Sequence, residues 1–194
     1  MELIFCTHNE NKVLEINTLL PEVFQLKSLS DYGYSDEIEE TGSTLEENAL
    51  IKARTIYNSF KKNCFADDSG LEVEALEGKP GVYSARYAGN QKNANDNISK
   101  LLRELEEIDN RLACFRTVIA LILDGKEYLF EGIVKGEISQ RPIGKNGFGY
   151  DPIFIPENQK LSFAQLSLSE KNKISHRSMA FKKLLEFLTA NKSI

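Results

Sequence analysis

The feature that most constrains the fold is a pair of long strand-like runs, residues 112–123 and 127–138, joined by Asp124-Gly125. An Asp-Gly step between two such runs predicts a tight β-hairpin, so these two strands run antiparallel. The first third of the chain instead alternates strand-like and helix-like segments, which is typical of an α/β protein. The sequence therefore predicts an α/β fold with a mixed β-sheet and flanking helices.

The remaining elements follow from the period of the apolar residues. Helical spacing predicts helices over residues 9–20, 44–58 and 93–107 and a last helix through Phe181 and Leu188. Short apolar runs predict strands at residues 2–7, 23–29, 63–66 and 152–156. Polar and glycine-rich composition favours loops over residues 30–43 and 68–89, with room for a short strand or turn near Leu71–Ala75. Since no repeat or linker divides the chain, we expect a single domain over residues 1–194.

Charge and composition argue against several classes of protein. The formal net charge of −5 argues against a nucleic-acid-binding surface. No segment approaches the ~18 apolar residues of a membrane span, and the first residues do not have the pattern of a signal peptide. Cys6, Cys64 and Cys114 lie far apart in the sequence, so we expect free thiols, with Cys6 and Cys64 buried. We therefore expect a cytoplasmic protein that binds neither nucleic acid nor membrane.

The segment Thr7-His8-Asn9-Glu10-Asn11-Lys12 is a candidate phosphate site, because it follows the first predicted strand and opens the first predicted helix. Free backbone N–H groups and the helix dipole at such a place favour a bound anion, and Lys12 adds a full positive charge. The segment does not have the G-x-x-x-x-G-K-[ST] pattern of a P-loop. An ordinary helix cap beside a solvated lysine remains the alternative.

Two acidic segments are candidates for holding a divalent metal ion. One is E-I-E-E at residues 37–40, in a predicted loop, and the other is Asp67-Asp68, directly after the apolar run 63–66. Magnesium prefers hard oxygen ligands and usually takes one or two protein carboxylates plus phosphates. Burying carboxylates is costly, so structure alone explains Asp67-Asp68 poorly. A solvated loop for the first segment and an Asp cap or turn for the second remain the alternatives.

The glycine-rich segment N-G-F-G-Y-D at residues 146–151, together with residues 169–177, is a candidate for binding a nucleobase. Glycines on both sides of Phe148 expose its ring, which can stack on a base. Asp151, His176 and Arg177 can read the polar edge of that base. Taken alone, Phe148 also fits the role of a core aromatic and His176 that of a surface or cap residue.

Read in order, these segments resemble the inosine/xanthosine triphosphate pyrophosphatase family. The resemblance covers almost the whole chain and rests on the collinear motifs T-H-N-E-N-K, E-E-T-G-S-T-L-E-E-N-A-L-I-K-A, A-D-D-S-G-L-E-V, P-G-V-Y-S-A-R-Y, N-G-F-G-Y-D-P-I-F and S-E-K-N-K-I-S-H-R. It implies two lobes around a central cleft, a homodimer and a Mg²⁺ cofactor. It further implies that water attacks the α-phosphorus of inosine, deoxyinosine or xanthosine triphosphate, which releases pyrophosphate and a monophosphate and keeps these nucleotides out of DNA and RNA.

The resemblance also implies roles for individual residues. Asp68 matches the proton acceptor and a metal ligand, and Glu39 matches the other metal-site carboxylate. The residues implied to bind the phosphates are Thr7, His8, Asn9, Glu10, Asn11, Lys12, Lys52 and Ser69. Those implied to hold the base, or to close over base and phosphate, are Phe148, Gly149, Tyr150, Asp151, Lys171, His176 and Arg177.

His8 is the visible departure, because the first motif of this family usually reads T-G-N. A histidine can adopt a positive φ at some cost, and His8 can narrow the pocket or touch phosphate. Two other functions stay open at this point. One is a pyrophosphatase for pyrimidine or otherwise modified triphosphates, and the other is a module that binds a nucleotide without cleaving it.

Overall fold

The computed structural model describes residues 1–191 and divides the chain into two compact units. Unit 1 contains Met1–Asp68, Thr117–Gly132 and the chain from Arg177 on, and unit 2 contains Ser69–Arg116 and Ile133–His176. The helices are α1 (Glu10–Asn17), α2 (Leu45–Phe60), α3 (Ala94–Glu104), α4 (Leu168–Ile174) and α5 (His176–Ala190). Within residues 1–191, no helix is both long and apolar enough for a membrane span.

The strands form a mixed sheet, as predicted. They are β1 (Glu2–Phe5), β2 (Gln25–Lys27), β3 (Cys64–Val73), β4 (Pro80–Gly81), β5 (Leu112–Leu123), β6 (Lys126–Ile138) and β7 (Phe154–Pro156). Their order is β2-β1-β3-β5-β6-β7, with β4 paired to β3. β1 is parallel to β2 and β3, whereas β4 and β7 pair antiparallel with β3 and β6. The hairpin turn lies at Asp124 and Gly125, whose φ values of 50° and 80° are the left-handed conformations that a tight hairpin needs.

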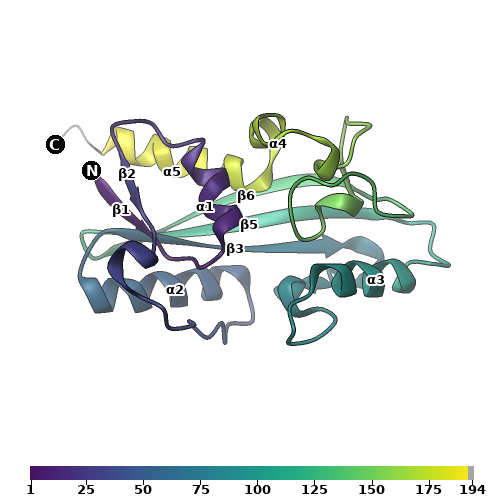
Figure 1. Ribbon diagram of the computed structural model, residues 1–194, viewed down its shortest axis with the longest axis horizontal. Coiled ribbons are helices and arrows are strands. Elements are labelled where there is room, and N and C mark those ends of the chain that lie inside the picture. The colour runs from purple at the N-terminus through teal and green to yellow at the C-terminus, as the bar shows by residue number, and fades with distance from the viewer. Residues whose placement is uncertain (192–194) are drawn as a thin grey trace. The chain divides into compact units, whose positions relative to one another are not determined.

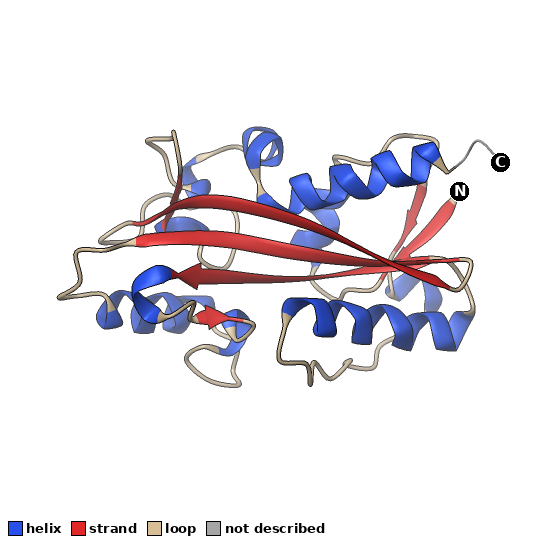
Figure 2. Ribbon diagram, turned by 180° about the vertical axis from the view of Figure 1, so that it is seen from behind, coloured by secondary structure: helices blue, strands red, loops and turns tan. Residues whose placement is uncertain are grey.

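In unit 1, α1 and α5 cover one face of the strands and α2 covers the other (Figures 1 and 2). The core beneath α1 and α5 is aromatic: Phe5 and Phe65, which are paired neighbours on β1 and β3, stack with ring centroids 4.5 Å apart. Phe181 of α5 packs on Phe65. On the other face, α2 begins after Thr44, whose hydroxyl caps the helix by accepting a hydrogen bond from the N–H of Glu47.

Unit 2 has its own apolar core, around Phe115, Phe154 and Phe163. The helix α3 contributes Leu101, which is fully buried. In Figure 1, α3 and α4 lie on opposite sides of the strands of this unit. Short 3₁₀ turns punctuate the loops of both units, at Ser30–Tyr32, Glu74–Leu76, Ser84–Arg86, Asp151–Ile153 and Phe163–Gln165.

The sequence prediction was wrong over residues 68–70, where it expected a loop, although it allowed a short strand or turn near Leu71–Ala75. The strand β3 instead runs on to Val73 and pairs with β4. Gly70 makes this possible, because a Cβ at that position would lie 2.6 Å from the carbonyl oxygen of Gly81. The glycine that suggested a loop therefore marks a close approach of two backbones. As a result, Asp67 and Asp68 lie inside a strand and not beyond its end.

The three cysteines are free, and Cys6 and Cys64 are buried, as predicted. Cys114 is half-buried in unit 2, where its thiol donates a hydrogen bond to Glu72. Burial, and then the negative charge of Glu72, raise the pKa of Cys114 to about 11.

We expect Cys114 to react slowly with iodoacetamide at pH 8, because each unit of raised pKa lowers the fraction of reactive thiolate about tenfold. Replacing Glu72 by Gln removes the nearby negative charge and should speed the reaction. Mass spectrometry of the alkylated protein over time measures both rates. An unchanged rate in the Glu72→Gln variant would show that Glu72 has no effect on the thiol.

Candidate functional site

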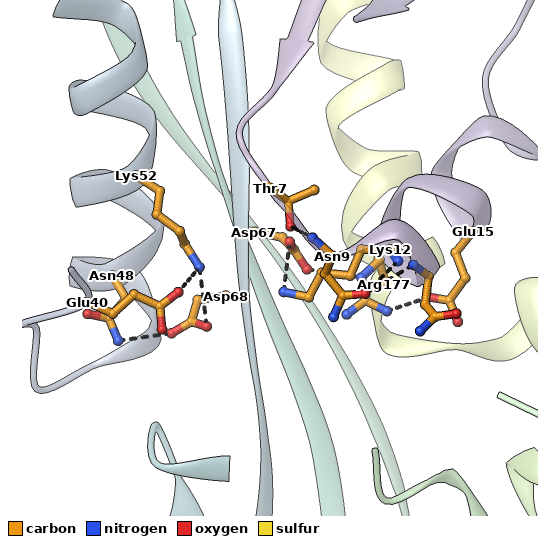
Figure 3. A network of polar contacts seen from close by, with 11 residues as sticks. Thr7, Asn9, Lys12, Glu15, Glu40, Asn48, Lys52, Asp67, Asp68 and Arg177 are labelled. Carbon is orange, nitrogen blue, oxygen red and sulfur yellow. Dashed lines mark hydrogen bonds and ion pairs between the residues drawn. The ribbon is translucent and has the colours of Figure 1, made fainter. Parts of the chain in front are cut away.

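Asp67 and Asp68 are neighbours on β3 but have different partners. Because successive side chains of a strand alternate between its faces, the two carboxylates point apart. Figure 3 shows the partners of Asp68 on one side of β3 and those of Asp67 on the other. Unit 1 therefore contains two separate groups of charged residues.

The first group, here called the Asp68 cluster, consists of Glu40, Asn48, Lys52 and Asp68. Asp68 is 7% exposed, accepts a hydrogen bond of 3.1 Å from the Asn48 amide and lies 3.6 Å from the Lys52 ammonium. The same ammonium lies 2.5 Å from the carboxylate of Glu40. Asn48 and Lys52 are four residues apart on α2, so they share one face of that helix.

Burial and the neighbouring charges act in opposite directions on the pKa values of Asp68 and Lys52. Burial raises the pKa of Asp68, Lys52 acts against this rise, and Glu40 adds to it, so the pKa lies above its ordinary value. Burial lowers the pKa of Lys52, but the carboxylates of Asp68 and Glu40 more than offset this effect. Lys52 is therefore a charged lysine held between two acids, and Asp68 is a carboxylate that accepts a proton more readily than an ordinary aspartate.

The acid that shares Lys52 with Asp68 is Glu40, whereas the residue selected from the sequence was Glu39. Glu39 is exposed, and its role as a metal ligand stays a prediction. Gly42 fixes this segment to α2, since its N–H donates to the Asn48 side-chain oxygen at 2.8 Å. A Cβ at Gly42 would lie 2.7 Å from the same oxygen, which explains the glycine of the E-E-T-G motif. Across the described chain, no group of three or more His, Cys, Asp or Glu side chains is arranged to hold a metal ion by itself.

The second group, here called the Arg177 network, consists of Lys12, Glu15, Asp67 and Arg177. One oxygen of Asp67 accepts from the Lys12 ammonium at 3.0 Å, and the other accepts from Arg177 Nε at 3.0 Å. Arg177 also donates through Nη1 to the carboxylate of Glu15. Burial raises the pKa of Asp67, but Lys12 and Arg177 more than offset this effect and hold it well below its usual range. Burial lowers the pKa of Lys12, and Asp67 only partly restores it.

The loop before α1 is stabilised by its own side chains. Asn9 caps α1 and accepts from the N–H groups of Asn11 and Lys12, and the Thr7 hydroxyl accepts from the N–H of Asn9. The expectation of free N–H groups is therefore wrong for these three residues. The helix cap of the alternative is confirmed, but its solvated lysine is not, because the Lys12 ammonium binds Asp67 and the Lys12 side chain is only 13% exposed.

His8 does not need the positive φ considered from the sequence, because the positive-φ residues of the described chain do not include it. Its side chain is exposed, with Nε2 3.0 Å from the carbonyl oxygen of Asp36 and its ring stacked 6.3 Å from that of Tyr34. His8 therefore contacts the segment that leads to Glu40. Glu10 and Asn11 are exposed at the start of α1.

In unit 2, the candidate base-binding residues form a compact group around Asp151. Its carboxylate accepts from the backbone N–H of Phe148 at 2.8 Å and from the ammonium of Lys171 at 2.6 Å. That ammonium also lies 4.8 Å from the centre of the Phe148 ring. A Cβ at Gly147 would lie 2.0 Å from the Asp151 carboxylate, so the glycine before Phe148 is required by this contact.

Three further residues of the prediction lie in unit 2. The hydroxyl of Tyr150 donates to the carbonyl of Ser84, so Tyr150 is anchored in the core. His176 is buried and stacks on Phe115, with ring centroids 4.5 Å apart. Ser69 is half-buried and follows Asp68 in β3. The surface position considered for His176 is thus wrong, and Phe115 is a neighbour that the sequence did not suggest.

The predicted residues are therefore divided between the two units. The residues predicted to bind the phosphates and the metal lie in unit 1, except Ser69, which lies in unit 2. Arg177 also lies in unit 1. The residues predicted to hold the base lie in unit 2. The sequence prediction did not include Glu15, which is a glutamate in an amphipathic helix. Its position three residues after Lys12 was the available signal.

Comparison with known proteins agrees with these motifs. The model of the Ham1 family matches residues 3–187. A protein of Christiangramia forsetii (strain DSM 17595 / CGMCC 1.15422 / KT0803) named dITP/XTP pyrophosphatase is 54% identical, over 97% of this chain and 100% of that protein. A protein of the same name from Bacillus subtilis (strain 168) is 49% identical, over 97% and 98%.

Two solved structures of Ham1 proteins have the same fold as this chain. The Staphylococcus aureus Ham1 protein superposes with a TM-score of 0.89 at 41% identity, covering 98% of this chain and 100% of that one. A HAM1 protein from Coxiella burnetii gives a TM-score of 0.89 at 41% identity, covering 98% and 99%. With a family match over nearly its whole length and relatives at about half identity, this chain belongs to the Ham1 family.

Proposed function

We propose that this protein hydrolyses noncanonical purine nucleoside triphosphates, such as ITP, dITP and XTP, to the monophosphate and pyrophosphate. The observation that carries this proposal is the Asp68 cluster, in which a buried carboxylate lies beside a charged lysine. Relatives that span the whole chain are named dITP/XTP pyrophosphatase. A triphosphate brings about four negative charges, so its hydrolysis depends mainly on positioning and charge stabilisation.

Magnesium fits the donor set of this cluster. Asp68 and the acidic segment 37–40 offer hard carboxylate oxygens, and Asp68 and Glu40 already share one cation, Lys52. Two carboxylates are as many as a protein Mg²⁺ site usually supplies, the remaining ligands being phosphate oxygens and water. We propose Asp68 and Glu39 as the ligands, with Glu40 beside them. When bound, the metal would neutralise phosphate charge and lower the pKa of the attacking water.

The chain's own residues account for the remaining chemistry. Asp68 accepts the proton of the attacking water, a role that suits a carboxylate whose pKa is raised by burial. Lys52 and Lys12 bring positive charge to the phosphates as pyrophosphate leaves. Ser69 follows Asp68 in β3 and, with Thr7 to Asn11, completes the proposed phosphate residues.

Recognition of the base is assigned to unit 2. Phe148 presents its ring for stacking, Gly149 and Tyr150 shape the loop, and Asp151 and Lys171 fix it. Hypoxanthine and xanthine carry a 6-oxo acceptor, whereas adenine carries a 6-amino group that would leave a site donor unpaired. Such a mismatch costs about 1–3 kcal/mol, roughly ten- to a hundredfold in selectivity. His176 and Arg177 are the proposed residues that close over base and phosphate. We propose that residues 1–194 act as a single catalytic domain.

The test is a panel of purine and pyrimidine triphosphates assayed for released pyrophosphate, with and without Mg²⁺. We expect ITP, dITP and XTP to be cleaved at least about tenfold faster than ATP, and removal of divalent ions to stop turnover. A preference for pyrimidine triphosphates would support the alternative substrate class. Tight binding without cleavage would identify a nucleotide-binding module and refute the proposal.

Lys52→Met is expected to lower kcat/KM by about 10²-fold or more, since it removes a charge that acts on the departing phosphates. The free energy of unfolding should fall by less than the free energy that corresponds to this loss of kcat/KM, because Met keeps the length and apolar stem of Lys52 on α2. Steady-state kinetics and thermal unfolding of the same samples test this. A large drop in Tm with unchanged turnover would assign Lys52 a purely structural role.

We further infer a homodimer in the cytoplasm. The free cysteines suit a reducing compartment. Light scattering at several protein concentrations measures the oligomeric state, and a monomer at all of them would refute the dimer.

A further inference from the structure

Glu15 is a buried glutamate to which no motif of the sequence assigns a function. It lies on α1 with its side chain 4% exposed, and its carboxylate binds the guanidinium of Arg177. Glutamates on short helices are normally solvated, and burying a carboxylate is costly unless a cation is paired with it. The position of Glu15 therefore depends on Arg177, whose side chain is only 2% exposed.

The contact continues from Arg177 to the phosphate loop. Arg177 holds one oxygen of Asp67 at 3.0 Å, which leaves the other oxygen to bind the Lys12 ammonium, also at 3.0 Å. Figure 3 shows this chain of contacts from Glu15 to Lys12. The side chains of Glu15, Arg177 and Asp67 are at most 4% exposed, whereas that of Lys12 is 13% exposed. Lys12 is thus the most accessible member of the Arg177 network.

The first and last residues of this series of contacts, Glu15 and Lys12, both lie on α1. Lys12 and Glu15 are three residues apart, so they lie on the same face of the helix and reach toward Asp67 and Arg177 together. With two acids and two bases, the Arg177 network has no net charge. Without the charge of Glu15, Arg177 would bind Asp67 more strongly, and Lys12 would lose part of its hold on the Asp67 carboxylate.

We propose that Glu15 is a positioning residue, which acts through Arg177 and Asp67 to hold the Lys12 ammonium in place for the phosphates of the substrate. This inference rests on the proposed function, in which Lys12 binds the triphosphate. Glu15 itself touches no substrate. Its effect should therefore be on substrate binding more than on the chemical step, and it should require Lys12.

The test is a double-mutant cycle with Glu15→Gln, Lys12→Met and both together, and with Glu22→Gln as the matched control, an exposed glutamate of unit 1. We expect Glu15→Gln to raise KM for ITP about tenfold with little change in kcat, which is within the coupling range of residues in one charge network. In the Lys12→Met background the same change should alter KM less than about twofold. Glu22→Gln should behave as wild type.

The same double-mutant cycle can be measured without turnover. Calorimetry then gives the affinity of each variant for inorganic pyrophosphate in the presence of Mg²⁺. Equal losses in both backgrounds, or full affinity in Glu15→Gln, would overturn the proposal. If Glu15→Gln fails to fold, Glu15→Asp takes its place, because it keeps the charge and only shortens the side chain. A wild-type protein that cleaves no triphosphate would refute the proposed function, whereas the pyrophosphate cycle would still decide the role of Glu15.

Discussion

Asp68→Asn is expected to lower kcat for ITP by about 10²–10⁴-fold, which is the contribution of a well-placed general base. The amide has nearly the same shape as the carboxylate but cannot accept the proton of the attacking water. The fold should be retained, because Lys52 keeps its contact with Glu40 at 2.5 Å when the charge of Asp68 is removed. Pyrophosphate release measures the loss, and thermal unfolding checks the fold.

A matched control is Asp109→Asn, which makes the same chemical change at an exposed loop position. It should leave both kcat and Tm unchanged. The concentration of Mg²⁺ separates the two roles proposed for Asp68. If turnover of Asp68→Asn recovers fully at high Mg²⁺, Asp68 acts only as a metal ligand. Wild-type turnover at ordinary Mg²⁺ would refute both roles.

Asp67→Asn should instead act mainly on stability and lower the free energy of unfolding at pH 7 by about 3–5 kcal/mol. Asp67 is 1% exposed and lies between Lys12 and Arg177. Without its charge, Arg177 would keep its contact with Glu15, but Lys12 would lose the carboxylate with which it is paired. Breaking a buried ion pair by removing one partner is costly for this reason. Urea unfolding at equilibrium, with Asp109→Asn as the control, measures the difference.

The effect of Asp67→Asn should also depend on pH. Lys12 and Arg177 hold the folded-state pKa of Asp67 well below its ordinary value of 3.8, despite the opposing effect of burial. A group whose pKa is lowered by folding stabilises the protein above its unfolded-state pKa and loses this contribution as the pH falls through the folded-state value. The difference in free energy of unfolding between the wild type and Asp67→Asn should therefore be constant from pH 7 to about 5 and become smaller below about pH 4. An equal difference in free energy of unfolding at pH 3 and at pH 7 would show that the charge of Asp67 is not what stabilises the fold.

These two variants test how one strand gives neighbouring acids separate functions. Asp68 faces α2 and its lysine, where a carboxylate with a raised pKa can take up a proton. Asp67 faces α1 and the start of α5, where two cations keep it ionised. A one-residue shift of register would exchange these environments, because side chains alternate along a strand. The pairing of β1 with β3 therefore also determines which aspartate has the raised pKa.

Local signals in the sequence were sufficient for much of the fold. The hairpin at Asp124-Gly125, the start of α2 at Thr44 and the apolar faces of the helices all depend on residues close together in the chain. Backbone conformation and amphipathic period are local properties, so the mixed α/β class could be predicted from them. The motifs that marked Asp68, Lys52 and Phe148 were likewise contiguous.

Only the tertiary structure decided which charges meet. Arg177 lies 162 residues from Glu15 and 110 from Asp67, and no local pattern couples such positions. The continuity of β3 through Gly70 was equally hidden, because it depends on how closely Gly70 approaches Gly81. The sequence by itself therefore determined the element types and the motif residues, whereas folding selected their partners. The physical reason is that burial and ion pairing depend on distances in space, which the spacing of residues along a chain does not contain.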